Sequence, residues 1–197
     1  MVMEMNTGAV LYEKNVDEVH YPASITKIMT TLIAIEKGKM DDIVTFSADA
    51  VYKNEGDTSH ISRDLEEKMT LEQCLYGVML ESANECAYAV AEHIGGGDVS
   101  KFVDMMNEKA IQIGCENTCF VTPNGLDATA EYTMEDGSKV TKEHATTATD
   151  LARILSYCIT GSPKREQFLE ITRTPAYAFG DIDHKRNFSC NNHNAFL

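Results

Sequence analysis

The sequence predicts a mixed α/β domain of the α+β type, in which a β-hairpin precedes a helix-rich middle. Three observations lead to this fold class. A turn signal at Asn6-Thr7-Gly8 divides residues 2–13 into two short runs, as expected of a hairpin. Apolar residues recur at helical spacing in several later stretches. Residues 171–188 have the character of an extended segment.

The length of the chain limits its organisation. At 197 residues it can bury a sizeable core, and one domain or two interleaved subdomains are expected. We assign residues 1–20 to the hairpin, residues 21–170 to a mainly helical subdomain and residues 171–197 to an extended segment. A lone two-stranded hairpin is marginal in water, and its free edges invite pairing. We therefore predict that the hairpin pairs with residues 171–188, with a second copy of the chain, or with both.

The first predicted helix covers residues 24–37. Pro22-Ala23 stops the preceding strand and prepares a helix start. The apolar stripe that follows is strong and has helical spacing: Ile25, Ile28, Met29, Leu32 and Ile33. We therefore expect a buried helix whose N-terminal end carries Ser24.

The remaining chain alternates helices with polar stretches. Helices are predicted for residues 70–81, 84–94, 98–113 and 147–160. Residues 43–68 are mixed and polar, with a turn expected at Glu55-Gly56-Asp57. Residues 122–145 resemble a long irregular loop, with turns at Pro123-Asn124-Gly125 and Asp136-Gly137.

The first chemical motif is Ser24-Ile25-Thr26-Lys27. A serine and a lysine three positions apart share one face of a helix. A serine hydroxyl is a weak nucleophile until a base takes its proton, and lysine can be that base when burial and neighbouring positive charge lower its pKa. The spacing therefore indicates a nucleophile and its base within one turn, at a helix N-terminus that favours developing negative charge. The simpler alternative is that Ser24 caps the helix and Lys27 is solvated.

The second motif is Ser82-x-Asn84, which lies between two helical patterns. A junction between buried helices holds polar side chains rigidly. A hydroxyl there can relay a proton, and an amide can hold both a lysine and a substrate carbonyl. The alternative is that Ser82 caps the second helix. A second Ser-x-Asn, Ser189-Cys190-Asn191, lies in a polar stretch without a helix pair, and we discount it.

These motifs and their surroundings resemble the serine D-alanyl-D-alanine carboxypeptidases, which are the low-molecular-weight penicillin-binding proteins. The resemblance follows the chain in order through five segments: Asn6–Asn15, Tyr21–Thr30, Met69–Ala87, Phe102–Asn107 and Phe120–Asp127. It implies a β-lactamase/transpeptidase-like fold.

The resemblance also implies roles for individual residues and partners. Ser24 would be the acylated nucleophile and Lys27 its general base, while Ser82 and Asn84 would relay a proton and hold the substrate. The implied substrate is a peptidoglycan pentapeptide ending in D-Ala-D-Ala, and β-lactam antibiotics would be covalent inhibitors. No cofactor is implied. The family is exported, so an extracytoplasmic, cell-wall or membrane-associated location is implied for the whole protein.

One part of the family pattern is absent. The third motif, Lys-Thr-Gly, occurs nowhere in the 197 residues, and neither does Lys-Ser-Gly. In the family its lysine helps to bind the substrate carboxylate, and its strand supplies half of the oxyanion hole. We expect the chain to be part of a carboxypeptidase that lacks the C-terminal strands of the sheet, and to be weak or inactive by itself.

Two rival functions stay open. A class A-like β-lactamase shares the fold and the Ser-x-x-Lys pattern, and it would need a glutamate to activate water; the candidates are Glu131 and Glu135. The other rival is a non-catalytic module that binds penicillin or wall peptide.

Composition narrows the remaining possibilities. The net charge of −14 argues against nucleic acid and anionic membrane surfaces as partners. The six cysteines include no Cys-x-x-Cys, and the histidines show no metal spacing, so no metal is expected. We assign His144 to a surface or core role by default. Neither a signal peptide nor a membrane span is recognisable.

Overall fold

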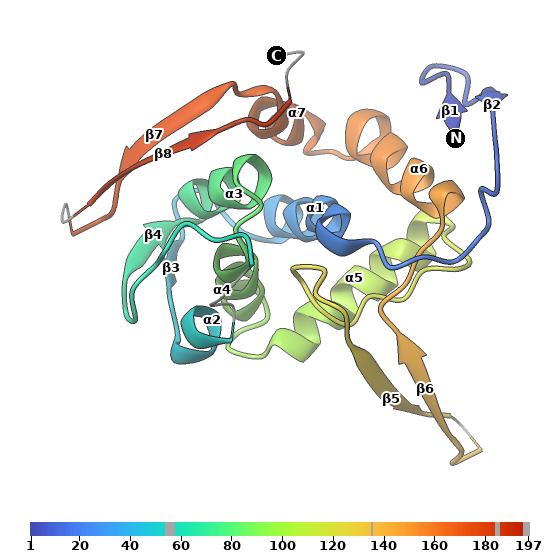
Figure 1. Ribbon diagram of the computed structural model, residues 1–197, viewed down its shortest axis with the longest axis horizontal. Helices are drawn as coiled ribbons and strands as arrows, with labels where there is room; N and C mark the ends of the chain where they lie inside the picture. The colour runs from blue at the N-terminus through green and yellow to red at the C-terminus, as the bar shows by residue number, and fades with distance from the viewer. Residues whose placement is uncertain (54–57, 135, 184–185, 195–197) are drawn as a thin grey trace.

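The computed structural model describes residues 1–53, 58–134, 136–183 and 186–194, and the predicted turn at Glu55-Gly56-Asp57 lies outside them. In Figure 1 a cluster of helices occupies the centre, and pairs of strands lie around it. The longer helices are α1 (Lys27–Lys37), α3 (Leu71–Leu80), α4 (Asn84–Ile94), α5 (Val99–Ile113), α6 (Ala148–Ser156) and α7 (Arg165–Arg173). Shorter pieces are α2 (Ala48–Tyr52), the 3₁₀ turn η1 (Ala23–Thr26) and the π-helical turn η2 (Tyr157–Gly161).

The strands of the described residues form four separate two-stranded antiparallel sheets. Their pairs are β1 (Val2–Met3) with β2 (Val10–Tyr12), β3 (Ile43–Thr45) with β4 (Lys68–Thr70), β5 (Thr129–Thr133) with β6 (Lys139–Glu143), and β7 (Ala176–Gly180) with β8 (Asn187–Asn191). Helices and strands thus mix as the predicted fold class requires, and no larger sheet forms within these residues.

The helical core forms where the apolar stripes predict it. The fully buried members of α1 include Met29, Leu32 and Ile33, which pack in one cluster with apolar side chains of α3 and α4. Burial of each such side chain stabilises the fold by roughly 1.5–3 kcal/mol. Because α1 is enclosed in this way, the residues at its N-terminal end have fixed positions.

Local capping explains where α3 begins. The Thr70 hydroxyl accepts a hydrogen bond from the Gln73 backbone N–H at 3.1 Å, and the Gln73 side chain accepts from the Thr70 N–H at 2.9 Å. This reciprocal capping box satisfies two backbone donors that the helix itself leaves unpaired. The predicted helices at 70–81, 84–94 and 98–113 are confirmed within one or two residues.

Two expectations about the strands need correction. Residues 122–145 contain the hairpin β5–β6 instead of only an irregular loop, although the turn at Asp136-Gly137 is confirmed. Polar side chains dominate both strands, and β6 is exposed along its whole length, so no apolar alternation marks them. Residues 171–173 continue α7 before the extended part begins.

The N-terminal hairpin also pairs differently from the prediction. Its turn lies at Asn6-Thr7-Gly8 as expected, but pairing with residues 171–188 is wrong, because β7 pairs with β8. Figure 1 places β1–β2 and β7–β8 at opposite ends of the molecule. Pairing across the few residues between β7 and β8 closes a much shorter loop than pairing with the N-terminus, so it costs less chain entropy. Pairing with a second copy stays a prediction.

Candidate active site

Ser24 and Lys27 lie together at the start of α1. Ser24 belongs to the 3₁₀ turn η1, and Lys27 is the first residue of the α-helix. The Lys27 ammonium nitrogen Nζ donates a hydrogen bond to the Ser24 hydroxyl oxygen Oγ at 3.1 Å. Lys27 is only 2% exposed, so the alternative of a solvated lysine beside a capping serine is wrong.

Lys27 has three hydrogen-bond acceptors from three parts of the chain. Besides Ser24, its Nζ donates to Asn84 Oδ1 at 2.7 Å and to the Asn124 backbone carbonyl at 2.8 Å. Burial lowers the pKa of Lys27 to about 8, and the nearby Glu85 carboxylate opposes part of this shift. A lysine with such a pKa is neutral in a substantial fraction of molecules near pH 7–8, as a general base requires.

Ser82 and Asn84 lie at the junction of α3 and α4, as predicted. Asn84 is the first residue of α4 and contacts Lys27 through its side chain. Ser82 has a left-handed backbone with φ of 57°, and its buried hydroxyl has no hydrogen-bond partner among the described residues. The residue that caps α4 is Ala83, so the capping role considered for Ser82 is wrong. A strained residue with an unpaired buried hydroxyl is typical of functional sites.

The loop at Thr122-Pro123-Asn124-Gly125 completes the surroundings of Lys27. Thr30 of α1 donates its hydroxyl hydrogen to the Pro123 carbonyl, one residue before the carbonyl that accepts from Lys27. The sequence predicts a turn here, and the segment belongs to the family resemblance. The contact between the Asn124 backbone and Lys27 had no sequence signal, because a main-chain carbonyl is common to every residue.

A buried histidine lies behind the same turn. The His144 ring is fully buried. Its Nδ1 accepts hydrogen bonds from the backbone N–H groups of Val121 at 2.9 Å and Thr122 at 3.2 Å. Its Nε2 lies 2.8 Å from the Thr26 hydroxyl oxygen. Burial lowers the pKa of His144 to about 4, partly opposed by Asp127. Of the surface and core roles considered for His144, the structure shows the core role, at a position next to the site.

Glu85 is a second buried group near Lys27. It is 3% exposed, and its Oε1 accepts from the Ile61 backbone N–H at 2.6 Å. Its other oxygen, Oε2, has no hydrogen-bond partner among the described residues. Burial raises the pKa of Glu85. No sequence pattern assigned a role to Glu85.

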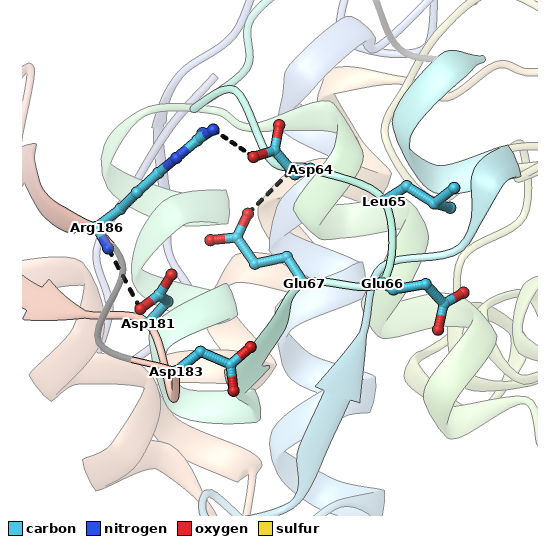
Figure 2. A pocket seen from close by; sticks show the side chains of 7 residues that line it. All are labelled: Asp64, Leu65, Glu66, Glu67, Asp181, Asp183 and Arg186. Atoms are coloured by element: carbon cyan, nitrogen blue, oxygen red, sulfur yellow. Dashed lines mark hydrogen bonds and ion pairs between the residues drawn. The ribbon is translucent and has the colours of Figure 1, made fainter.

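A different hollow lies away from this cluster. It has a volume of about 160 Å³ and is lined mainly by acidic side chains from the loop before β4 and from the residues between β7 and β8. Figure 2 shows Arg186 between Asp64 and Asp181: its guanidinium forms an ion pair with Asp64, and its backbone N–H donates a hydrogen bond to Asp181. Ser24, Lys27, Ser82 and Asn84 are all absent from its lining.

The family follows from comparison with known proteins. The family model described as D-alanyl-D-alanine carboxypeptidase, peptidase S11, matches residues 1–197. The chain belongs to this family. The membership confirms the resemblance drawn from the five sequence segments. In the described residues, no helix is long and apolar enough to cross a membrane.

Curated members of the carboxypeptidase family support the same assignment. The chain is 39% identical over 137 residues to D-alanyl-D-alanine carboxypeptidase DacA of Haemophilus influenzae, with 67% of this chain and 35% of that protein aligned. It is 40% identical over 137 residues to DacF of Bacillus subtilis, with 67% and 34% aligned. The chain therefore matches about a third of the length of these relatives.

Solved structures in the family share the fold. A D-alanyl-D-alanine carboxypeptidase from Mycobacterium tuberculosis superposes with a TM-score of 0.79 at 27% identity, over 99% of this chain and 66% of that one. Penicillin binding protein 5 from Haemophilus influenzae superposes with a TM-score of 0.77 at 31% identity, over 96% and 50%. These scores confirm the predicted transpeptidase-like fold class.

Proposed function

We propose that the chain provides the acylation machinery of a serine-type D-Ala-D-Ala carboxypeptidase that acts on peptidoglycan stem peptides. The observation that supports it most is the buried Lys27 amine, 3.1 Å from the Ser24 hydroxyl. Family membership supplies the substrate class, because the relatives are named for D-alanyl-D-alanine cleavage. Such substrates occur outside the cytoplasm, so we propose an extracytoplasmic location for the whole protein.

The proposed first step is acyl transfer to Ser24. Neutral Lys27 takes the hydroxyl proton, and Ser24 Oγ forms a bond to the carbonyl carbon of the penultimate D-alanine. The C–N bond to the terminal D-alanine then breaks. The leaving amine receives a proton relayed through Ser82, whose hydroxyl has no other partner among the described residues. Asn84 holds Lys27 through its Oδ1 and leaves its amide N–H₂ for the substrate carbonyl.

Water completes the reaction by attacking the acyl-Ser24 ester. The ester C–O bond breaks, the shortened peptide leaves as a carboxylate, and Ser24 recovers its proton. A β-lactam would acylate Ser24 in the same way, by opening its ring. Because Lys-Thr-Gly is absent from the 197 residues, we expect slow turnover of peptide by this chain alone. Removal of one oxyanion-hole donor by itself costs roughly 10²–10³ in rate.

The test is intact-mass measurement after incubation with a fluorescent penicillin. We expect one adduct per wild-type chain and none in Ser24→Ala, with both proteins equally folded by circular dichroism. An adduct that persists in Ser24→Ala would overturn the assignment of the nucleophile. Absence of an adduct in the folded wild type would favour the non-catalytic binding module for this chain.

The release rate of the adduct distinguishes carboxypeptidase from β-lactamase. Slow release is expected of the former and fast release of the latter. Among the two glutamates considered for water activation, Glu131 lies on the exposed hairpin β5–β6 and forms an ion pair with Lys139 at 2.6 Å. Glu135 lies outside the described residues. Within the described part of the chain, no contact of Glu131 favours the β-lactamase.

A further inference from the structure

The side chain of His144 connects the nucleophile turn to the segment whose Asn124 carbonyl contacts Lys27. This residue follows β6 directly and is fully buried. Two backbone bridges directly after His144 fix its place: Ala145 pairs with Cys119, and Thr146 pairs with His20. The imidazole is therefore held between the 119–122 segment and η1.

The hydrogen bonds assign the tautomer of this ring. Nδ1 accepts from two backbone N–H groups, those of Val121 and Thr122, so Nδ1 carries no hydrogen. The hydrogen of the neutral ring is then on Nε2, which donates to the Thr26 hydroxyl at 2.8 Å. Thr26 lies between Ser24 and Lys27 in the sequence and is 1% exposed.

We propose that His144 is a positioning residue for acylation, which couples the 121–124 loop to the nucleophile turn through its Nε2-H tautomer. At one end of the ring, Nδ1 positions the loop whose Asn124 carbonyl accepts a hydrogen bond from Lys27. The other end orients Thr26, and with it the turn that carries Ser24. Small misplacement of a reacting pair costs up to about a hundredfold in rate. The inference rests on the proposed acylation at Ser24.

The chain offers two variants that remove the link between the ring and Thr26, one from each side. In His144→Asn, the shorter side chain retains an acceptor near Nδ1 but does not reach Thr26. Thr26→Val removes the hydroxyl and preserves the shape of the side chain. His20→Asn is the matched control, because the His20 side chain is 63% exposed and only the backbone of His20 forms the bridge to Thr146.

The first measurement is the second-order rate of penicillin acylation. We expect His144→Asn and Thr26→Val each to slow it about tenfold, the double variant to be no slower than the slower single, and His20→Asn to match wild type. Additive losses in the double variant would overturn the coupling. Rates within twofold of wild type for both single variants would overturn the proposal as well.

The second measurement reads Lys27 without any reaction. NMR titration of the ¹³C-labelled lysine side chain follows the pKa of Lys27. The charged group that acts on Lys27 is Glu85 of α4, and the one that acts on His144 is Asp127. In His144→Asn the loop is no longer linked to Thr26. We expect this to weaken the contact between the Asn124 carbonyl and Lys27 and to lower the Lys27 midpoint, because the ammonium then has a poorer acceptor. A general loss of folded protein would reduce the signal without moving this midpoint.

The two measurements also separate failure of the inference from failure of the proposed function. If the wild-type protein forms no penicillin adduct, the lysine titration still tests the coupling. The ¹⁵N chemical shifts of the His144 imidazole, which report its tautomer, test it as well. An Nδ1-H tautomer, or an unchanged Lys27 midpoint in His144→Asn, would overturn it. The Nε2-H tautomer together with a lowered midpoint would support it.

Discussion

Gly125 lies directly against the carbonyl oxygen of Ala23, the residue before the proposed nucleophile. A Cβ built on Gly125 would come within 1.9 Å of this oxygen, and Gly125 has a φ of +87° that favours glycine. Ala23 itself has a left-handed backbone with φ of 48°. Two unusual backbone conformations therefore meet where the 122–125 loop contacts the nucleophile turn.

Gly125→Ala should disturb both the fold and the site. The new methyl meets backbone, which cannot move aside as a flexible side chain can, and it adds the cost of a positive φ. We expect the free energy of unfolding to fall by about 2–4 kcal/mol, measured by urea denaturation, and penicillin acylation to slow at least tenfold. Gly137→Ala is the control, since Gly137 has a φ of +81° with nothing near its Cβ position. It should cost only about 1–2 kcal/mol, the strain of a left-handed backbone in a residue with a Cβ. Equal losses in the two variants would argue against the contact with Ala23.

The acylation rate should rise with pH through the pKa of Lys27, which burial lowers to about 8. The neutral amine is the proposed base, so the reactive fraction is small below this pKa and reaches its plateau above it. Stopped-flow acylation between pH 6 and pH 10 measures the midpoint. Lys27→Met should lose this dependence together with most of the rate. A rate that falls as pH rises through 8 would exclude Lys27 as the base.

Glu85→Gln should lower the pKa of Lys27 further. The Glu85 carboxylate raises this pKa, whereas a neutral amide would not, and glutamine retains an oxygen that can accept from the Ile61 N–H. We expect the midpoint of the acylation profile to shift to lower pH, with the plateau rate within about threefold. Glu131→Gln, on the exposed β5–β6 hairpin, should leave the midpoint in place. A midpoint unchanged by Glu85→Gln would show that Glu85 does not act on Lys27.

Buried His144 should make the fold sensitive to mild acid. Its pKa is lowered from 6.5 to about 4 in the folded chain, so between these values the unfolded chain binds the proton and the folded chain does not. The stabilising difference is complete above pH 6.5 and is lost as pH falls towards 4. The free energy of unfolding should decrease by about 3 kcal/mol from this group. Urea denaturation at pH 7 and pH 4.5 should show a smaller decrease for His144→Asn than for wild type. Identical decreases would contradict a neutral buried ring.

The parts of the fold that could be predicted are those with a local physical signal. The helices α3, α4 and α5 follow from apolar residues at helical spacing, and the structure adds side-chain caps from Thr70 and Asp98 at the starts of α3 and α5. The Ser24–Lys27 pair follows because a helical turn brings the two side chains to one face. Ser82 and Asn84 could be found because they lie at a break between two helical patterns.

The missed elements lack such a signal. The hairpin β5–β6 is almost wholly solvent-exposed, so its strands carry polar residues that also suit a loop. Helix α7 buries only Phe168 and Ile171, which is too short a stripe for confident assignment from spacing. His144 is 118 residues from Thr26, and neither residue alone marks the contact.

The sequence by itself determined the local chemistry: a serine and lysine on one face, a polar pair between two helices, and the family to which these motifs belong. The tertiary structure decided how that chemistry is tuned. In the folded chain, buried Lys27 donates to Asn84 Oδ1 and to the Asn124 carbonyl, and His144 contacts Thr26. The Ser82 hydroxyl has no hydrogen-bond partner among the described residues. The spacing of residues along the sequence determines which side chains are neighbours within one helical turn. Burial of a charged group and contacts between distant segments arise only when the chain has folded.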